Sequence, residues 1–116
     1  MSLLKQYILT FLLLFCSQIH AQQIKIGNYT FPAGGGEYQG EMFKGKPYGK
    51  GTTKYPNGDF HTGNYVKGKR EGHGVYQFSD GEKYDGEWFQ DQQHGFGTYY
   101  FSNNNRYEGL WFRDFQ

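Results

Sequence analysis

The chain has 116 residues, with 12 Lys and Arg against 11 Asp and Glu, four His and a single Cys. This length predicts one small domain, and the near-neutral charge argues against a general nucleic-acid binder, which carries an overall basic footprint. Aromatic residues are the unusual component, with 11 Tyr, 11 Phe and 2 Trp in the chain. Past residue 27 the aromatic residues greatly outnumber the aliphatic ones and must therefore supply the packing.

Residues 1–21 differ from the rest of the chain and are typical of a helical secretory signal peptide. Lys5 gives a positive start, an apolar run extends from Tyr7 to Phe15, and Ala21 provides a small residue for cleavage. The run is shorter than the roughly 20 residues that span a membrane comfortably, and an uncleaved anchor is the alternative. Cleavage predicts a secreted, periplasmic or cell-surface protein that has lost Cys16 and therefore has no disulfide.

Residues 22–37 are expected to form one strand and a linker. The segment from Gly27 to Phe31 matches the segment from Gly51 to Tyr55, so the mature chain starts on the second strand of a repeated unit. The following linker is one residue longer than its later counterparts, which predicts a bulge at that junction. Asn28-Tyr29-Thr30 satisfies the N-glycosylation sequon, which would matter only in a eukaryotic secretory host.

From residue 38 onward, a block of fixed spacing recurs every 23 residues. It defines units at 38–60, 61–83 and 84–106 and a partial unit at 107–116. The recurring positions are Tyr38, His61, Tyr84 and Tyr107; Gly40, Gly63, Gly86 and Gly109; Met42, Tyr65, Trp88 and Trp111; and the pairs Gly49/Gly51, Gly72/Gly74 and Gly95/Gly97. Such a period predicts a stacked array of small units, which presents an extended surface and seldom carries a catalytic cleft.

Each unit contains two short stretches with alternating side chains, which favours strands. Asn-Gly and Asp-Gly pairs after Pro56 and Ser79 indicate tight hairpin turns, whereas the segment from Lys44 to Gly49 reads as a longer turn. The expected fold is all-β, with tandem hairpins in one elongated, twisted antiparallel sheet of about eight strands.

Strand alternation places Tyr84, Gly86 and Trp88 on one face of this sheet, opposite Phe89. The period then aligns equivalent residues into stripes, with a glycine column that leaves slots for neighbouring rings. Two further columns are expected, one on the return strands and one on the opposite face: Tyr55, Phe78 and Phe101; and Phe43, Val66, Phe89 and Phe112. The rings of the stripes are interpreted as the core rather than as an exposed site for a peptide, glycan or lipid tail.

The segment Tyr84-x-Gly86-x-Trp88, followed by His94-Gly95-x-Gly97, is very similar to the MORN (membrane occupation and recognition nexus) repeat. The resemblance extends from about residue 27 to 116. The chain departs from the pattern at His61, which replaces the usual Tyr, at Met42, which replaces Trp, and at Asp91 and Asn104, which replace turn glycines. The resemblance implies a hairpin array used for protein–protein contact, scaffolding or, in some members, association with phospholipid.

A basic cluster marks the longer turns of the first two units. Its members are Lys44, Lys46, Lys50, Lys67, Lys69 and Arg70. If the hairpins stack in register, these side chains project from one edge and form a candidate site for an anionic lipid headgroup or an acidic partner, since each base near an anionic bilayer adds about 1 kcal/mol. The alternative is that solvated turns are simply rich in lysine. The turn of the third unit, from Gln90 to His94, favours this alternative because it carries no fixed positive charge.

No catalytic, cofactor or metal site is predicted. His61, His73 and His94 occupy different columns and share no metal-ligand spacing, and no nucleophile and base stand together. The sequence therefore predicts an exported, non-catalytic interaction or scaffold module, with a peripheral membrane module as the alternative. Because open sheets expose unpaired edges, self-association through a terminal strand such as Tyr107 to Phe112 is also expected.

Overall fold

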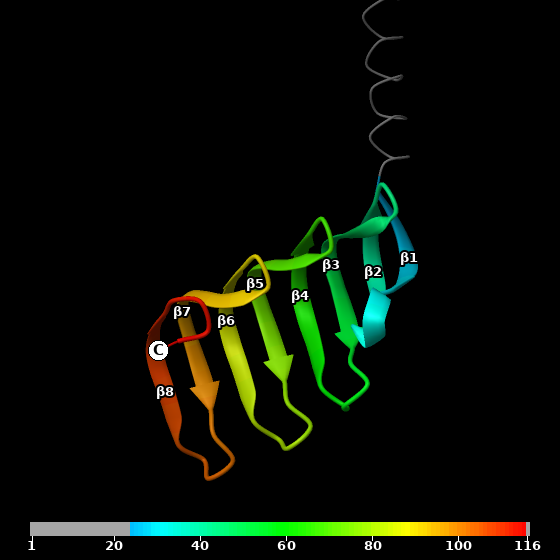
Figure 1. Ribbon diagram of the computed structural model, residues 1–116. Helices are drawn as coiled ribbons and strands as arrows, with labels where there is room; N and C mark the ends of the chain where they lie inside the picture. The colour runs from blue at the N-terminus through cyan, green and yellow to red at the C-terminus, as the bar shows by residue number, and fades with distance from the viewer. Residues whose placement is uncertain (1–23, 116) are drawn as a thin grey trace, which may run out of the picture.

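The structure is a computed structural model that describes residues 24–115, so the expected signal peptide at residues 1–21 lies outside the described residues. Eight strands form one antiparallel sheet in which each strand lies beside its neighbours in the chain (Figure 1). The strands are β1 (Ile24–Thr30), β2 (Glu37–Phe43), β3 (Lys46–Lys54), β4 (Phe60–Val66), β5 (Lys69–Gln77), β6 (Lys83–Phe89), β7 (Gln92–Tyr100) and β8 (Arg106–Trp111). The prediction of an all-β array of consecutive hairpins is confirmed.

A row of glycines crosses the sheet from its first strand to its last. The strand register pairs each glycine with the next one: Gly27, Gly40, Gly51, Gly63, Gly74, Gly86, Gly97 and Gly109. The sequence predicted a glycine column on the first strand of each unit, and the structure joins that column to the glycines of the return strands. Bare backbone across all eight strands leaves a continuous channel for bulky neighbours.

Aromatic rings fill this channel from the adjacent row. A Cβ atom at Gly51 or Gly97 would lie closer than 3.0 Å to the ring of Tyr38 or Tyr84, a distance that real Cβ atoms do not reach. The hydroxyl of Tyr38 donates a hydrogen bond to the Glu41 carbonyl at 2.6 Å, and that of Tyr84 donates to the Glu87 carbonyl at 2.8 Å. We refer to the face that carries these rings as the aromatic face and to its opposite as the second face.

The tyrosine bonds compensate for an irregularity in the ladder. The register between β2 and β3 shifts between Gly40 and Met42, and that between β6 and β7 shifts between Gly86 and Trp88. The residue at each shift, Glu41 or Glu87, has no register partner on the following strand, β3 or β7. Its carbonyl therefore needs another donor, because an unpaired backbone group is costly to bury. Tyrosine at the start of the unit reaches that carbonyl along its own strand.

The relative lengths of the two kinds of turn are the reverse of the expectation. Lys44-Gly45, Lys67-Gly68 and Gln90-Asp91 are two-residue turns with φ between 49° and 82° at every position, which matches the twist of a hairpin. The longer turn predicted from Lys44 to Gly49 is wrong because Gly49, at φ 99°, belongs to β3 at the register shift. We call this side of the sheet the tight-turn edge.

The opposite side, the long-loop edge, carries the longer connections. Tyr55 N donates to Asp59 O and Phe78 N donates to Glu82 O, both at 2.9 Å, so each closing pair encloses a loop of three residues. Turns at the predicted residues are confirmed, since Gly58 N donates to Tyr55 O and Gly81 N donates to Phe78 O, both at 3.0 Å, and these glycines have φ of 92° and 95°. They are longer than the turns of the opposite edge, which the sequence had suggested would be the longer ones. Tyr55, Phe78 and Phe101 follow the return strands instead of lying within them.

The extra residue of the first linker does not form the predicted bulge. The linker contains a short 3₁₀ turn, η1 (Pro32–Gly34), in which Ala33 has φ 54°. Phe31 N still donates to Gly36 O at 2.9 Å, the same closure as in the later loops. The additional residue is therefore accommodated in the loop, and the ladder on either side keeps its register.

Candidate functional site

The stripes of the aromatic face form the core of the sheet. Tyr84 is fully buried, Tyr38 and Tyr65 are 1% and 2% exposed, and Trp88 and Trp111 are each 6% exposed. Their rings meet edge to face, as between Tyr84 and Trp111 at 5.2 Å. Such pairs contribute about 0.5–1.5 kcal/mol beyond area burial. The interpretation of these residues as packing material is confirmed, and a binding site must use what lies around them.

Arg70 lies over this core instead of projecting from the edge. Its guanidinium carbon is 4.5 Å from the centroid of the Trp88 ring, an arrangement typical of a cation–π contact. Its Nε donates to Asp91 Oδ1 at 3.0 Å and its Nη2 donates to the Asp91 carbonyl at 2.8 Å. Of the six bases in the predicted cluster, Arg70 is therefore neutralised by a neighbouring unit and faces the aromatic side.

A repeated backbone contact holds Arg70 and its equivalents at the tight-turn edge. Asp91 N donates to Arg70 O at 3.1 Å while the Asp91 carboxylate accepts from Arg70 N at 2.9 Å. Asp114 makes the same two bonds with Gln93, at 2.9 and 2.8 Å. At the first junction, Gly68 N donates to Pro47 O at 2.9 Å. At this junction Pro47 has no N–H to donate, and Gly68 has no carboxylate to accept one.

Two hollows on the aromatic face meet at the Arg70–Asp91 pair. One, of about 300 Å³, is lined by Phe31, Pro32, Gly35, Tyr55, Tyr65, Gly68, Arg70 and Asp91. The other, of about 270 Å³, is lined by Arg70, Tyr76, Phe78, Trp88, Asp91, Gln93 and Asp114. Three aromatic residues line each hollow, and polar groups lie at the tight-turn side. This combination is typical of a recognition surface.

A ladder of rings forms the long-loop side of the same surface. Tyr55 and Tyr76 lie 5.5 Å apart, Tyr76 and Phe78 4.7 Å, and Phe78 and Tyr99 5.8 Å between ring centroids. Tyr55 and Phe78 were predicted from the sequence as one column of the array, whereas Tyr76 and Tyr99 were not. The period was the available signal, because Thr53, Tyr76 and Tyr99 are 23 residues apart.

Carboxylates fix the hydroxyl ends of this ladder. Asp59 accepts from Tyr76 Oη and from Ser79 N, both at 2.7 Å, and Glu82 accepts from Tyr99 Oη at 2.7 Å. Burial favours a raised pKa for Asp59, but the hydrogen bonds from Tyr76, Ser79 and Asn57 outweigh it and lower the pKa. Each carboxylate belongs to the unit before its tyrosine, so these contacts join successive hairpins.

The lysines of the predicted basic cluster occupy two separate places. Lys44 and Lys67 are turn residues, with Lys46 and Lys69 just beyond them, and all four are exposed at the tight-turn edge. Lys50 lies inside β3, on the second face. Apolar residues that directly precede the tight turns are exposed at the same edge: Val66 is 37%, Phe89 51% and Phe112 61% exposed. This edge is therefore both basic and apolar.

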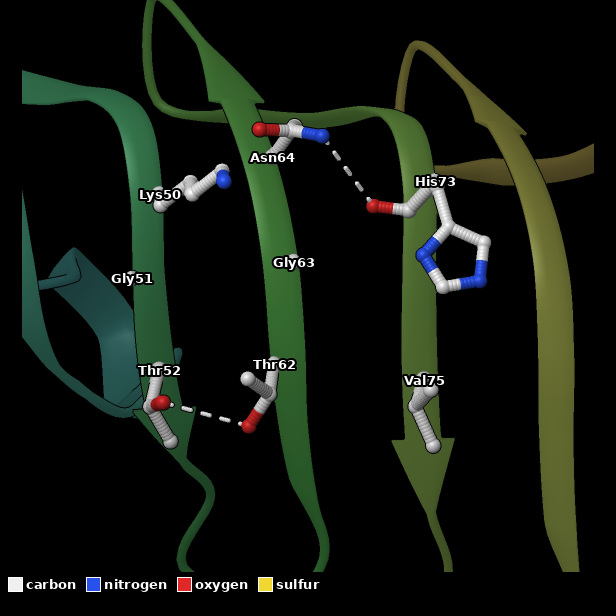
Figure 2. A pocket seen from close by; sticks show the side chains of 8 residues that line it. All are labelled: Lys50, Gly51, Thr52, Thr62, Gly63, Asn64, His73 and Val75. Carbon is white, nitrogen blue, oxygen red and sulfur yellow. Dashed lines mark hydrogen bonds between the residues drawn. The ribbon is translucent and has the colours of Figure 1, made fainter.

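The second face has a shallow hollow of about 490 Å³ over β3, β4 and β5 (Figure 2). Its floor is the glycine row at Gly51 and Gly63, and polar side chains surround it. Thr52 and Thr62 share a hydrogen bond at 3.1 Å, and Asn64 Nδ2 donates to the His73 carbonyl at 3.5 Å. Because these groups already bond one another, the hollow offers a ligand less than the ring-lined hollows do.

The histidines do not form a site together. His61 is fully buried among rings, and neither of its ring nitrogens has a hydrogen-bond partner. Burial, with smaller effects of Arg70 and His73, lowers the pKa of His61 to about 3. His73 Nε2 lies 2.7 Å from Asp85 Oδ1 on the second face. Across residues 24–115, no three His, Cys, Asp or Glu side chains group as metal ligands.

Helices contribute little to this part of the chain. Within residues 24–115, none has the length and apolar character needed to cross a bilayer.

Comparison with known proteins gives one clear result. The model of the MORN repeat family matches three consecutive segments, residues 38–60, 61–83 and 84–106. These segments cover more than half of the chain and contain β3 to β7 and all of β2 except Glu37. A comparison with curated protein sequences finds no match.

Proposed function

The chain belongs to the MORN repeat family, and from this premise we propose that it is an exported, non-catalytic interaction module that holds a protein partner on its aromatic face. Repeats of this family generally serve in protein or membrane interaction. The shape supports this use, because a one-layer array exposes extended surfaces rather than an enclosed reaction centre.

One observation carries the proposal: the two ring-lined hollows that meet at Arg70 and Asp91. Core packing already buries Tyr65 and Trp88, so the walls are rigid before a partner arrives. Rigid aromatic walls reduce the ordering cost of binding, and buried aromatic and arginine side chains are the usual anchors of interfaces. We infer that the partner inserts two apolar or aromatic side chains, one on either side of the Arg70–Asp91 pair.

Capture with matched variants tests this proposal. Phe78→Ser removes one wall of the second hollow, while Val75→Ser removes a side chain of similar exposure from the second face. Each variant and the wild-type protein are immobilised and exposed to the extracellular or periplasmic fraction of the host, after thermal unfolding shows that both variants are folded. We expect Phe78→Ser to lose a protein that the wild type and Val75→Ser retain. Equal capture by all three would contradict the proposal.

The tight-turn edge favours a second candidate function, contact with anionic phospholipid. Lys44, Lys46, Lys67 and Lys69 project there beside exposed Val66 and Phe89. Lysine near an anionic bilayer attracts the surface, and the adjacent apolar side chains have the amphipathic character of an interfacial segment. Lys44 Nζ also lies 5.3 Å from the Phe43 ring centroid, which keeps that base next to an apolar group.

Liposome co-sedimentation separates the two functions. Vesicles of phosphatidylcholine with one quarter phosphatidylserine are compared with pure phosphatidylcholine vesicles, at low and high salt. If the edge binds lipid, binding requires the anionic component, falls with salt, and is lost when Lys44, Lys46, Lys67 and Lys69 are all changed to Gln. Binding that is unchanged by salt and by these substitutions would rule out the lysine edge as the contact.

Export is a separate part of the proposal and rests on residues 1–21 alone. The positive start, apolar run and small residue at Ala21 support a secretory signal. N-terminal sequencing of the protein recovered from its host tests cleavage. A mature chain that begins at Gln22 is expected, whereas an intact N-terminus in the membrane fraction would indicate a retained anchor.

A further inference from the structure

The two outer strands of the described sheet have complementary phases in the repeat. β8 is the first strand of a unit, since Tyr107, Gly109 and Trp111 match Tyr84, Gly86 and Trp88. β1 is the second strand of a unit, since Gly27, Tyr29 and Phe31 match Gly51, Thr53 and Tyr55. Among residues 24–115, each of these strands is hydrogen-bonded on one side alone. From this complementarity we propose that the protein binds a second copy of itself head to tail, with β8 of one copy pairing with β1 of the next to complete a hairpin unit between chains.

The backbone directions agree with this pairing. Phe101 N donates to Asn105 O at 2.8 Å, and Tyr99 pairs with Tyr107 two residues further along the same ladder. Hydrogen-bonded pairs recur at every second residue of an antiparallel ladder. The backbone N–H and C=O of Tyr107 therefore point toward β7, whereas those of Arg106 and Glu108 point outward. The corresponding bond from Phe31 N to Gly36 O directs the groups of Asn28 and Thr30 outward from β1.

The repeat fixes the register between the copies. Within the chain, Tyr84 faces Tyr99, Asp85 faces Thr98, and Gly86 faces Gly97. The equivalent pairs between copies place Tyr107 opposite Tyr29, Glu108 opposite Asn28, and Gly109 opposite Gly27 of the second copy. The outward backbone groups of Glu108 and Asn28 then meet, and the glycine row continues from one copy into the next.

The tyrosine on β8 lacks the covering that its equivalents have. Tyr38 and Tyr84 are buried, each against a glycine of the following strand, Gly51 or Gly97. Tyr107 is half-buried, and its hydroxyl makes the equivalent bond to Leu110 O at 3.1 Å. Gly27 of the second copy supplies the missing bare backbone, because a Cβ atom built there meets only Met42 Cγ, at 3.4 Å, in its own chain.

The long-loop edge offers a specific hydrogen bond across the same interface. Asp59 accepts from Tyr76 and Glu82 accepts from Tyr99, in each case across one unit boundary. Asn105 occupies the next equivalent position, and Tyr29 is the equivalent of Tyr76 and Tyr99. The Asn105 side-chain oxygen thus receives the Tyr29 hydroxyl of the second copy, a hydroxyl that makes no hydrogen bond to any of the described residues of its own chain.

Exposed apolar side chains on the second face also meet in this register. Glu41 accepts a hydrogen bond from Lys50 N at 2.7 Å across the first hairpin. The equivalents at the outer strands are Leu110 and Ile26, which are 70% and 75% exposed. Leu110 and Ile26 therefore stand where the first hairpin has a polar contact, and pairing between copies would cover both side chains.

The interface is short. Lys25 stands where the equivalent Gly49 has a positive φ at the register shift, and the bridge between Phe112 and Phe115 covers the far end of β8. Pairing is therefore confined to residues 106–110 against 26–30, and association is weak and dependent on concentration. Because the surfaces are different, the interface is heterologous and continues into a ring or an open filament.

Complementing variants of the full chain test the proposal by sedimentation equilibrium over a concentration series. Gly27→Ala blocks β1 by placing a methyl group under Tyr107, and it should weaken self-association about tenfold or more. Glu108→Pro blocks β8 by removing an outward N–H, a change that edge strands tolerate. We expect each variant alone to be monomeric and their equimolar mixture to form a dimer, while the wild type exceeds a dimer.

Other outcomes overturn the proposal. A wild type that stays monomeric at millimolar concentration would contradict the proposal. Self-association of Gly27→Ala with the same affinity as the wild type would indicate pairing of β8 with β8 instead. If Glu108→Pro fails to fold, Tyr29→Phe and Asn105→Ala serve in its place, since each removes one side of a single hydrogen bond. These two changes should weaken association non-additively, and purely additive effects would also count against the register.

Discussion

The ring of Tyr84 lies in the space that a side chain at Gly97 would occupy. The same relationship joins Tyr38 to Gly51, and at the remaining unit it joins His61 to Gly74. A recurrent ring packed on a recurrent bare backbone position in the next strand explains why the period keeps both residue types. It also makes the cost of a methyl group depend strongly on which glycine receives it.

Gly97→Ala is therefore expected to destabilise the fold, although its backbone φ suits any residue. A new Cβ atom would overlap the Tyr84 ring, and overpacking of this kind costs typically 1–3 kcal/mol. Gly27→Ala is the matched control, because its Cβ atom would make an ordinary contact with Met42 at 3.4 Å. Urea unfolding at low protein concentration measures both variants. Equal stability of the two would contradict the packing described above.

His61→Tyr should stabilise the protein. The imidazole has two buried nitrogens without partners, and burying an unpaired polar group is unfavourable. A tyrosine at this position can follow Tyr38 and Tyr84, whose hydroxyls donate to the carbonyl three residues ahead; here that carbonyl belongs to Asn64. We expect a gain of about 1 kcal/mol in the free energy of unfolding. His61→Phe, which adds the ring without the hydroxyl, is the control and should gain less.

The same histidine predicts how stability depends on pH. Burial lowers the pKa of His61 from 6.5 to about 3, so between these values the unfolded chain binds more protons than the folded one. Stability is therefore lost as the pH falls below 6.5, by at most about 1.4 kcal/mol per pH unit. Unfolding midpoints of the wild type and His61→Tyr at pH 7 and pH 5 measure this. The two proteins should diverge as the pH falls, and parallel curves would be the contrary result.

A double-mutant cycle tests the contact between Arg70 and Asp91. Arg70→Pro removes the N–H that the Asp91 carboxylate accepts, and Asp91→Gly removes the acceptor. Together the changes reproduce the natural pair Pro47 and Gly68 of the preceding unit. We expect the double variant to be more stable than the sum of the single effects by about 1–2 kcal/mol, measured by chemical unfolding. Additive effects would show that the two groups are not coupled.

Much of the fold is predictable from the sequence because the determinants recur. The glycines and rings of the units fix the strands, their order and the aromatic face. The turns after Lys44 and its equivalents were predicted to be too long because Gly49 and its equivalents look like turn residues, while their positive φ serves a register shift inside a strand. A residue pattern with glycine does not by itself distinguish a bulge from a turn.

The candidate site was less predictable because it depends on contacts between units. Arg70 was grouped with the edge lysines, and only the position of Asp91, 21 residues later, directs it over Trp88. The bonds from Tyr76 to Asp59 and from Tyr99 to Glu82 also cross a unit boundary. A sequence period shows that such positions are equivalent, whereas which equivalents touch depends on the stacking of the hairpins.

Site-specific photo-crosslinking in the native host tests the central claim most directly, because a crosslink forms with whichever protein lies against the chosen position. A benzophenone amino acid is placed at Tyr55 or Phe78, beside the two hollows of the aromatic face, and at Thr62 or Val75 on the second face. If a partner binds the aromatic face, the first two positions yield a crosslinked protein and the last two yield none. Crosslinks confined to Thr62 and Val75 would contradict it.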